Sequence, residues 1–177
     1  MSDYTVEKDW FYKDLRCVVI MGHMGFRCGY VGIDKTHPLY GIKYNAEIEI
    51  TENKKKALLK GEVGKRGVIS LFSYSLHEKI TPEILFDVHG GITFSGENKI
   101  YPVESDLWWI GFDCGHVDDG KDLSVVSDEL KKIELKWPTG GILRSLEYCT
   151  EECESLADQL FNFKEVNYEL AERFPSY

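Results

Sequence analysis

Short apolar runs along the first two thirds of the chain predict strands. Residues 15–21 contain the run Cys-Val-Val-Ile-Met, which favours a buried strand, and a turn from Gly22 to Gly25 leads to a second expected strand at residues 26–33, which together predict a β-hairpin. Residues 107–112 form the most apolar stretch of the middle region, so we expect a central strand that places Asp113 at its C-terminal end. Further strands are predicted at residues 47–51, 68–76, 84–88 and 92–95. Residues 4–14 form a polar-aromatic segment for which the pattern predicts no strand. Residues 129–137 are compatible with either a helix or a strand.

The last third of the chain has the periodicity of an amphipathic helix. Its apolar residues follow the i, i+3, i+4, i+7, i+8 spacing of one helical stripe: Cys153, Leu156, Ala157, Leu160 and Phe161. Thr150 is a suitable N-cap, and two glutamates follow it in the first turn, where the helix dipole favours negative charge. We therefore predict a helix over residues 150–163. The expected fold is α+β: an antiparallel or mixed sheet covered on one face by this helix, in a single globular domain spanning residues 1–177.

The amino-acid composition limits the kinds of molecule that the protein is expected to bind. The chain has 177 residues, of which 43% are hydrophobic and 29% charged, a balance typical of a folded protein with a proper core. A net charge of −9 argues against binding to a nucleic-acid backbone, because such binding needs Lys and Arg to neutralise phosphates. The basic run at residues 54–56 lacks interleaved aromatic residues and is interpreted as a solvated turn. An acidic surface with 13% aromatic residues suits contact with a basic protein partner.

The chain shows no sign of export or membrane insertion. Its first residues lack the apolar core of a signal peptide, and the best apolar run, residues 17–21, is too short to span a bilayer. Five cysteines without a Cys-x-x-Cys motif fit a reducing compartment better than a disulfide framework. We therefore expect a cytoplasmic protein without membrane contact.

The first chemically dense segment covers residues 87–96. Two adjacent glycines follow His89, and glycines permit positive φ angles and a close approach of the backbone to a ligand. Exposed N–H groups at such a place can hold an anion or a carbonyl oxygen. The candidate binding residues are Gly90, Gly91, Thr93 and Ser95. The alternative is a glycine-rich bulge that contains a hydrogen-bonded histidine.

The second dense segment follows the predicted strand at residues 107–112. An apolar strand that runs into Asp, Cys, His and Asp resembles the strand ends at which α/β scaffolds present reactive groups. The candidate catalytic residues of the two segments are His89, Asp113, Cys114 and His116.

Three interpretations of the second segment stay open. In the first, Cys114 is a nucleophile that a histidine activates. In the second, a divalent metal ion is the cofactor, and its ligands are His89, His116 and Asp118. In the third, Asp113 and Asp118 cap backbone amides in a tight turn. None of the spacings matches an established zinc or protease signature.

The motifs resemble a family of small uncharacterised proteins from bacteriophages and bacterial prophages. The resemblance spans roughly residues 26–163 and is carried by YVGI and HPLYG within residues 30–41, HGGITFSG at 89–96, WWIGFDCGH at 108–116 and RSLEY at 144–148. It implies a biological setting, in the cytoplasm of an infected host cell, and no reaction.

Two functional hypotheses follow. The first is a phage accessory protein of the host-takeover or anti-defence kind that binds and inhibits a host protein. The second is a small hydrolase or transferase acting on a nucleotide-like or acyl substrate with a His/Asp/Cys site. The second requires that His89 approach the acidic turn beyond Phe112 closely enough to share one cavity with it.

Overall fold

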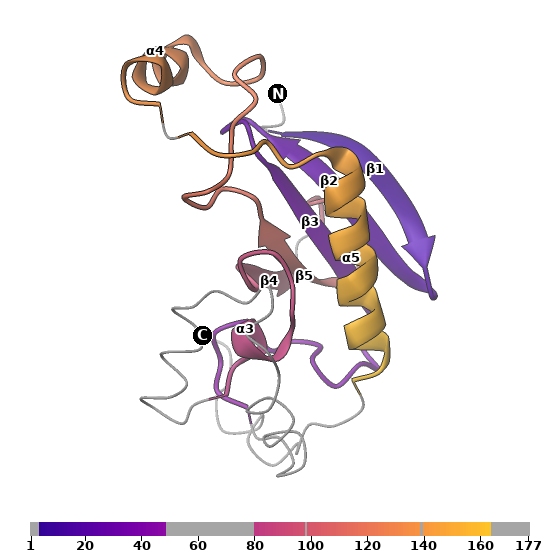
Figure 1. Cartoon of the computed structure of the whole chain (residues 1–177). Helices are drawn as coiled ribbons and strands as arrows, with labels where there is room; N and C mark the ends of the chain where they lie inside the picture. The colour runs from indigo at the N-terminus through magenta and orange to yellow at the C-terminus, as the bar shows by residue number, and fades with distance from the viewer. Residues whose placement is uncertain (1–3, 49–79, 98, 139, 164–177) are drawn as a thin grey trace.

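The structure, a computed structural model, describes residues 4–48, 80–97, 99–138 and 140–163 (Figure 1). Its elements are, in chain order, β1 (Tyr4–Tyr12), β2 (Leu15–Gly22), β3 (Arg27–Ile33), α3 (Pro82–Leu85), β4 (Phe94–Glu97), β5 (Trp108–Asp113), α4 (Asp128–Lys136) and α5 (Leu146–Phe161). The predicted strand at residues 68–76 and the basic run at 54–56 lie outside the described residues. Of the predicted strand at 47–51, the described residues Glu47 and Ile48 are not in a strand.

The described strands form an antiparallel five-stranded sheet in the order β1-β2-β3-β5-β4. The predicted hairpin is confirmed as β2 and β3, which pair from Arg16 opposite Gly32 to Met21 opposite Arg27. The predicted central strand is also confirmed, since β5 lies between β3 and β4 and ends at Asp113. The end of β5 lies beside the start of β3, with Asp113 opposite Cys28. Segments that leave this end of the sheet build the site described below.

Strand β1 was not predicted from the pattern of apolar residues. It is an edge strand whose pairing with β2 shifts register between Val6 and Lys8, so its apolar and polar residues do not alternate regularly. The tight turn between β1 and β2 places Lys13 and Asp14 at φ of 48° and 64°, the conformation that two-residue hairpin loops require. An interrupted alternation therefore hid a strand of nine residues.

The last described helix, α5, packs against one face of β2 and β3, and this confirms the predicted α+β fold. Its buried apolar side chains are Cys149, Cys153, Leu156, Ala157 and Leu160. The helix begins at Leu146, earlier than predicted, because the Ser145 hydroxyl accepts a hydrogen bond from the Tyr148 N–H and is the true N-cap. Thr150, the predicted cap, instead donates its hydroxyl to the Leu146 carbonyl inside the helix.

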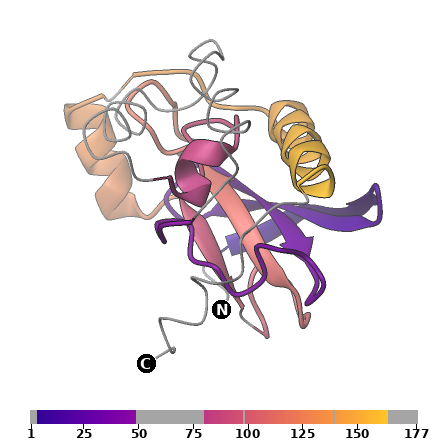
Figure 2. The same ribbon diagram turned by 90° about the horizontal axis from the view of Figure 1, so that it is seen from below.

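The described residues contain two further helices, α3 and α4. The strand predicted at residues 84–88 was wrong: Thr81 and Pro82 start a short helix, α3, because proline is preorganised for the first helical position. The segment left open at 129–137 is α4, which Ser127 caps by accepting from the Leu130 N–H. Figure 2 shows α5 (yellow) lying over the strands and α4 (orange) lying well apart from it. Within the described ranges, no helix combines the length and apolarity needed to cross a bilayer.

Candidate functional site

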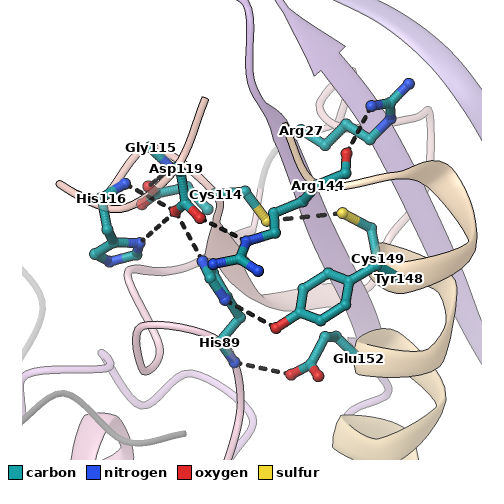
Figure 3. A network of polar contacts seen from close by, with 11 residues as sticks. Arg27, His89, Cys114, Gly115, His116, Asp119, Arg144, Tyr148, Cys149 and Glu152 are labelled. Carbon is teal, nitrogen blue, oxygen red and sulfur yellow. Dashed lines mark hydrogen bonds and ion pairs between the residues drawn. The ribbon is translucent and has the colours of Figure 1, made fainter. Parts of the chain in front are cut away.

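Three segments that are distant in the sequence meet beyond the end of β5. The loop that follows Val88 brings His89, the turn after β5 brings His116 and Asp119, and the segment that leads into α5 brings Arg144. The rings of His89 and His116 lie 5.3 Å apart, centre to centre, at an angle of 74°. Figure 3 shows the Asp119 carboxylate between them. The two rings therefore approach each other as the enzymatic hypothesis requires, but of the two only His116 lines the neighbouring pocket.

Asp119 is the centre of this cluster. Its Oδ2 accepts from His89 Nε2 at 2.8 Å and from the His116 N–H at 3.0 Å, and it lies 3.4 Å from His116 Nδ1. Its Oδ1 accepts from Arg144 Nε at 2.7 Å. The side chain is only 1% exposed. Burial raises the pKa of its carboxyl, but the hydrogen bonds from His89 and Arg144 outweigh burial and hold the pKa below the ordinary value. Asp119 is therefore an ionised, buried carboxylate at neutral pH.

His89 is fixed at three atoms. Its Nε2 meets Asp119, its Nδ1 hydrogen bonds with the Tyr148 hydroxyl at 3.0 Å, and its backbone N–H donates to Glu152 Oε2 at 2.9 Å. Burial raises the pKa of Tyr148 to about 12, so its phenol stays neutral at physiological pH. Tyr148 and Glu152 are four residues apart on α5 and so lie on the same face of the helix, toward His89. The helix that covers the sheet thus also orients this imidazole.

The two glycines after His89 have distinct structural reasons. Both have positive φ, 67° at Gly90 and 89° at Gly91, and the Gly91 N–H donates to the Val88 carbonyl to close a turn. A Cβ on Gly90 would lie 1.9 Å from Cε1 of His116, so the His116 ring rests directly against this backbone. The N–H groups of His89 and Gly91 already donate hydrogen bonds inside the protein, so they are not available to bind an anion as predicted.

The turn that carries His116 and Asp119 is locked to the segment before α5. The Asp119 N–H donates to the His116 carbonyl at 3.0 Å, and the Ile142 N–H donates to the Asp118 carbonyl at 3.1 Å. Asp119 and Ile142 form an isolated parallel bridge. A Cβ on Gly141 would lie 2.6 Å from the Asp118 carbonyl oxygen, so the close approach depends on this glycine. The bridge brings Arg144 to Asp119.

Several predicted site residues lie elsewhere. Asp113 accepts from the Gly115 N–H at 3.0 Å and so shapes the turn, as the third interpretation proposed. Asp118, proposed as a metal ligand, is exposed, and its neighbour Asp119 takes the place in the cluster. Ser95, proposed for binding, accepts from the Tyr44 N–H at 2.6 Å. Thr93 donates its N–H to the carbonyl of Gly111 in β5.

Cys114 lies close to the cluster, but its geometry does not suit a nucleophile. Its Sγ is 3.6 Å from Sγ of Cys149, and the residue is 1% exposed. The hydrogen bond with Cys149 and burial both raise the pKa of the Cys114 thiol well above its ordinary value. Thiolate chemistry at neutral pH is therefore disfavoured. All five cysteines are free thiols in the structure.

Four residues of the cluster were not predicted as site residues: Asp119, Arg144, Tyr148 and Glu152. Asp119 follows directly after the chosen Asp118, and spacing alone does not distinguish the two. Arg144 and Tyr148 belong to the RSLEY motif, which carried the resemblance without an assigned chemistry. Glu152 was interpreted as a residue that complements the helix dipole, whereas it is 1% exposed and binds the His89 backbone.

A pocket of about 290 Å³ opens beside the cluster and is lined by Cys114, Gly115, His116, Val117, Asp119 and Lys121. The His116 side chain is 38% exposed, so this imidazole connects the buried carboxylate with solvent. Ligand atoms of His89, His116 and Asp119 all lie within 4.8 Å of one another. Two imidazoles and a carboxylate at such separations form a set that one divalent cation is able to share.

Comparisons of the chain with protein-family models, with curated proteins and with solved structures found no match. What the protein does must therefore be inferred from the positions of its own side chains.

Proposed function

We propose that this protein is a small metal-dependent hydrolase whose centre is His89, His116 and Asp119. The observation that carries the proposal is the convergence of three ligand atoms, all within 4.8 Å of one another, beside a pocket that opens to solvent. A purely structural ion pair would not need a second, half-exposed imidazole at the edge of a pocket.

The ligand set supports this choice. Nitrogen and oxygen donors of this kind bind divalent transition ions, and three protein ligands leave coordination positions open for water and substrate. The ionised state of Asp119 suits a ligand, because a carboxylate binds a cation only when deprotonated. His89 also has the partner that metal-bound histidines usually have: with Nε2 on the ion, Nδ1–H would donate to the Tyr148 hydroxyl.

The chemistry expected at such a centre is hydrolysis. A bound divalent ion lowers the pKa of a coordinated water toward neutrality and polarises the group under attack. The water oxygen forms a bond to the electrophilic atom of the substrate, and the bond to the leaving group breaks. One water proton remains on the product and the other reaches the leaving group through solvent.

Metal binding to the purified protein tests the proposal. After treatment with a chelator, we expect one equivalent of Co²⁺ or Zn²⁺ to bind. The variants H116A and D119N should bind at least about tenfold more weakly, which is the loss expected even for a residue that only orients a ligand. Hydrolysis of a substrate from a panel of phosphate and acyl esters should disappear with chelator and return with metal.

Two matched variants serve as controls. D118N changes the exposed neighbour of Asp119, and H23A removes an exposed histidine in the turn between β2 and β3. Both should bind metal like the unmodified protein. Stoichiometric binding that survives in H116A and D119N, or the absence of binding by Co²⁺, Zn²⁺ and Mn²⁺ alike, would rule out this centre.

A specific observation favours a second candidate function, that of a phage accessory protein that binds and inhibits a host protein in the host cytoplasm. None of the residues of α4 is buried, and Ile133, Leu135 and the following Trp137 are exposed, Trp137 by 70%. Exposed apolar side chains on a helix that stands apart from the body suit a protein interface. The net charge of −9 favours a basic partner.

Purification of complexes from host cells, followed by titration with the isolated partner, tests this second function. We expect W137A to weaken binding by about thirtyfold, because buried tryptophans dominate interface energetics, while H116A binds normally. A partner that W137A binds as tightly as the unmodified protein does would contradict the role of α4.

A further inference from the structure

We infer that Arg144 selects the substrates of this site for an oxyanion and that phosphate esters are the substrate class. The inference rests on the proposed metal-dependent hydrolase and adds the chemical nature of what it binds. It is carried by the position and the unused donors of the guanidinium group.

Arg144 is held rigidly next to the proposed ligands. Its Nε donates to Asp119 Oδ1 at 2.7 Å, and its guanidinium carbon lies 5.2 Å from the centre of the Tyr148 ring. Figure 3 shows the group between the Asp119 carboxylate and this ring. Its own backbone carbonyl accepts from Arg27 Nη1 at 2.7 Å, which also fixes the main chain at this point. The side chain therefore needs little reorganisation to bind a ligand.

The N–H groups on the terminal nitrogens of Arg144 are available to bind a ligand. Among the described residues, neither Nη donates a hydrogen bond, and the side chain is 23% exposed. A guanidinium group offers five N–H donors in a planar fork that matches the geometry of phosphate and carboxylate oxygens. One N–H is used to orient Asp119, so the four N–H donors of the two Nη atoms remain next to the proposed metal ligand Asp119.

Charge balance points to an anion. A divalent ion and the Arg144 guanidinium, three positive charges together, would share one neighbourhood with two buried acidic side chains, Asp119 and Glu152. Lys121 lines the pocket beside the cluster but is already paired with Glu134 at 3.0 Å. The loaded site would thus carry excess positive charge within a protein whose net charge is −9, and an anionic substrate would relieve the repulsion between the ion and Arg144.

A cation and an arginine side by side form the arrangement that stabilises a phosphoryl group during transfer. In hydrolysis of a phosphate ester, a water oxygen bonds to phosphorus and the ester P–O bond breaks. The alkoxide that leaves takes up a proton from solvent. Arg144 would bind nonbridging oxygens throughout, on the side opposite to its bond with Asp119. Inorganic phosphate, the product, should bind to the same groups.

The Co²⁺-loaded protein and inorganic phosphate provide the test. Phosphate should change the visible absorption spectrum of bound Co²⁺ in a saturable manner. R144A and R144Q should bind phosphate at least tenfold more weakly at saturating Co²⁺, since a hydrogen bond between charged groups is lost. The glutamine variant keeps an N–H donor for Asp119 while it removes the charge, and its affinity for Co²⁺ should change little.

Arg16 is a control for surface charge, because its two terminal nitrogens already donate to Asp9 and to the Glu104 carbonyl. Its Nε also donates to an aspartate, Asp9, at 2.9 Å, and its side chain is 25% exposed, but it lies at the opposite end of β2 from the site. R16A should bind both Co²⁺ and phosphate like the unmodified protein. Any phosphate effect shared by R16A would mean that general surface charge, and not Arg144, holds the anion.

The outcomes separate this inference from the proposed function. If the unmodified protein binds no Co²⁺, the hydrolase proposal fails. If Co²⁺ binds but phosphate leaves its spectrum unchanged, or if R144Q binds phosphate as tightly as the unmodified protein, the metal centre stands and the inference is wrong. If R144A and R144Q both lose Co²⁺, Arg144 acts by positioning Asp119, and its assignment to substrate binding is also wrong.

Discussion

At the scale of single residues, the cluster depends on one carboxylate whose two oxygens both accept hydrogen bonds. Asp119 accepts from His89, from the His116 backbone and from Arg144, and it is almost completely buried. Asp118, one position earlier, points into solvent. Neighbouring side chains in a tight turn face different surroundings, so composition and spacing identify the turn but do not identify which of two adjacent aspartates faces inward.

Gly90 sets the position of the His116 ring. G90A should lower the free energy of unfolding by at least about 1 kcal/mol more than G41A, as judged by urea denaturation, because it adds a steric clash to backbone strain. Gly41 is the matched control: its φ is 80°, but a Cβ there would meet nothing within 4 Å. G90A should also lose the binding of Co²⁺, whereas G41A should keep it. Equal losses of stability would show that the His116 ring moves aside at no cost.

At the scale of elements, periodicity located the parts that bury a continuous face. Strands β2, β3 and β5 and the body of α5 were predicted because each has a regular apolar pattern over several residues. Strand β1 was missed because a shift in register interrupts its alternation, and α3 was missed because a short apolar run suits either a strand or a helix. Patterns specify long, evenly buried elements best.

The location of the candidate site was predicted better than its composition. Glycines beside His89 and an apolar strand ending at Asp113 marked two segments that do meet in space. The contacts of α5 with the site could not be predicted, because the apolar stripe identifies only the face of the helix that packs against the sheet. Tyr148 and Glu152 reach His89 from the helix, and their polar contacts leave no periodic signal.

At the scale of the whole molecule, the cluster joins three segments of the chain that are far apart in sequence. Asp119 links the loop after Val88, the turn after β5 and the segment before α5. On the sheet side, Arg27 of β3 pairs with Glu7 of β1 at 2.7 Å and binds the Arg144 carbonyl. Loss of the central carboxylate should therefore reduce the stability of the entire protein.

The pH dependence of unfolding tests this coupling. The pKa of folded Asp119 lies below the ordinary value of 3.8, so its contribution to stability is present above that value and is lost as the pH falls through the folded-state pKa. The free energy of unfolding should decline between about pH 5 and about pH 2, and less steeply in D119N. At neutral pH, D119N should cost roughly 2 kcal/mol or more, because it removes the charge that pairs with Arg144 and leaves one acceptor oxygen for donors that two carboxylate oxygens now bind. D118N should follow the unmodified protein at every pH, and a D119N curve parallel to it would contradict the coupling.

The wide separation in sequence of His89, Asp119 and Tyr148 has a consequence for how the protein is made. During translation, His89 and His116 are synthesised well before the residues of α5 that orient His89. A nascent chain that has emerged only as far as Asp119 lacks both Arg144 and Tyr148, so neither the carboxylate nor the imidazole of His89 has its full set of partners. The contacts that fix this cluster should therefore form only after the segment from Arg144 to Glu152 has left the ribosome.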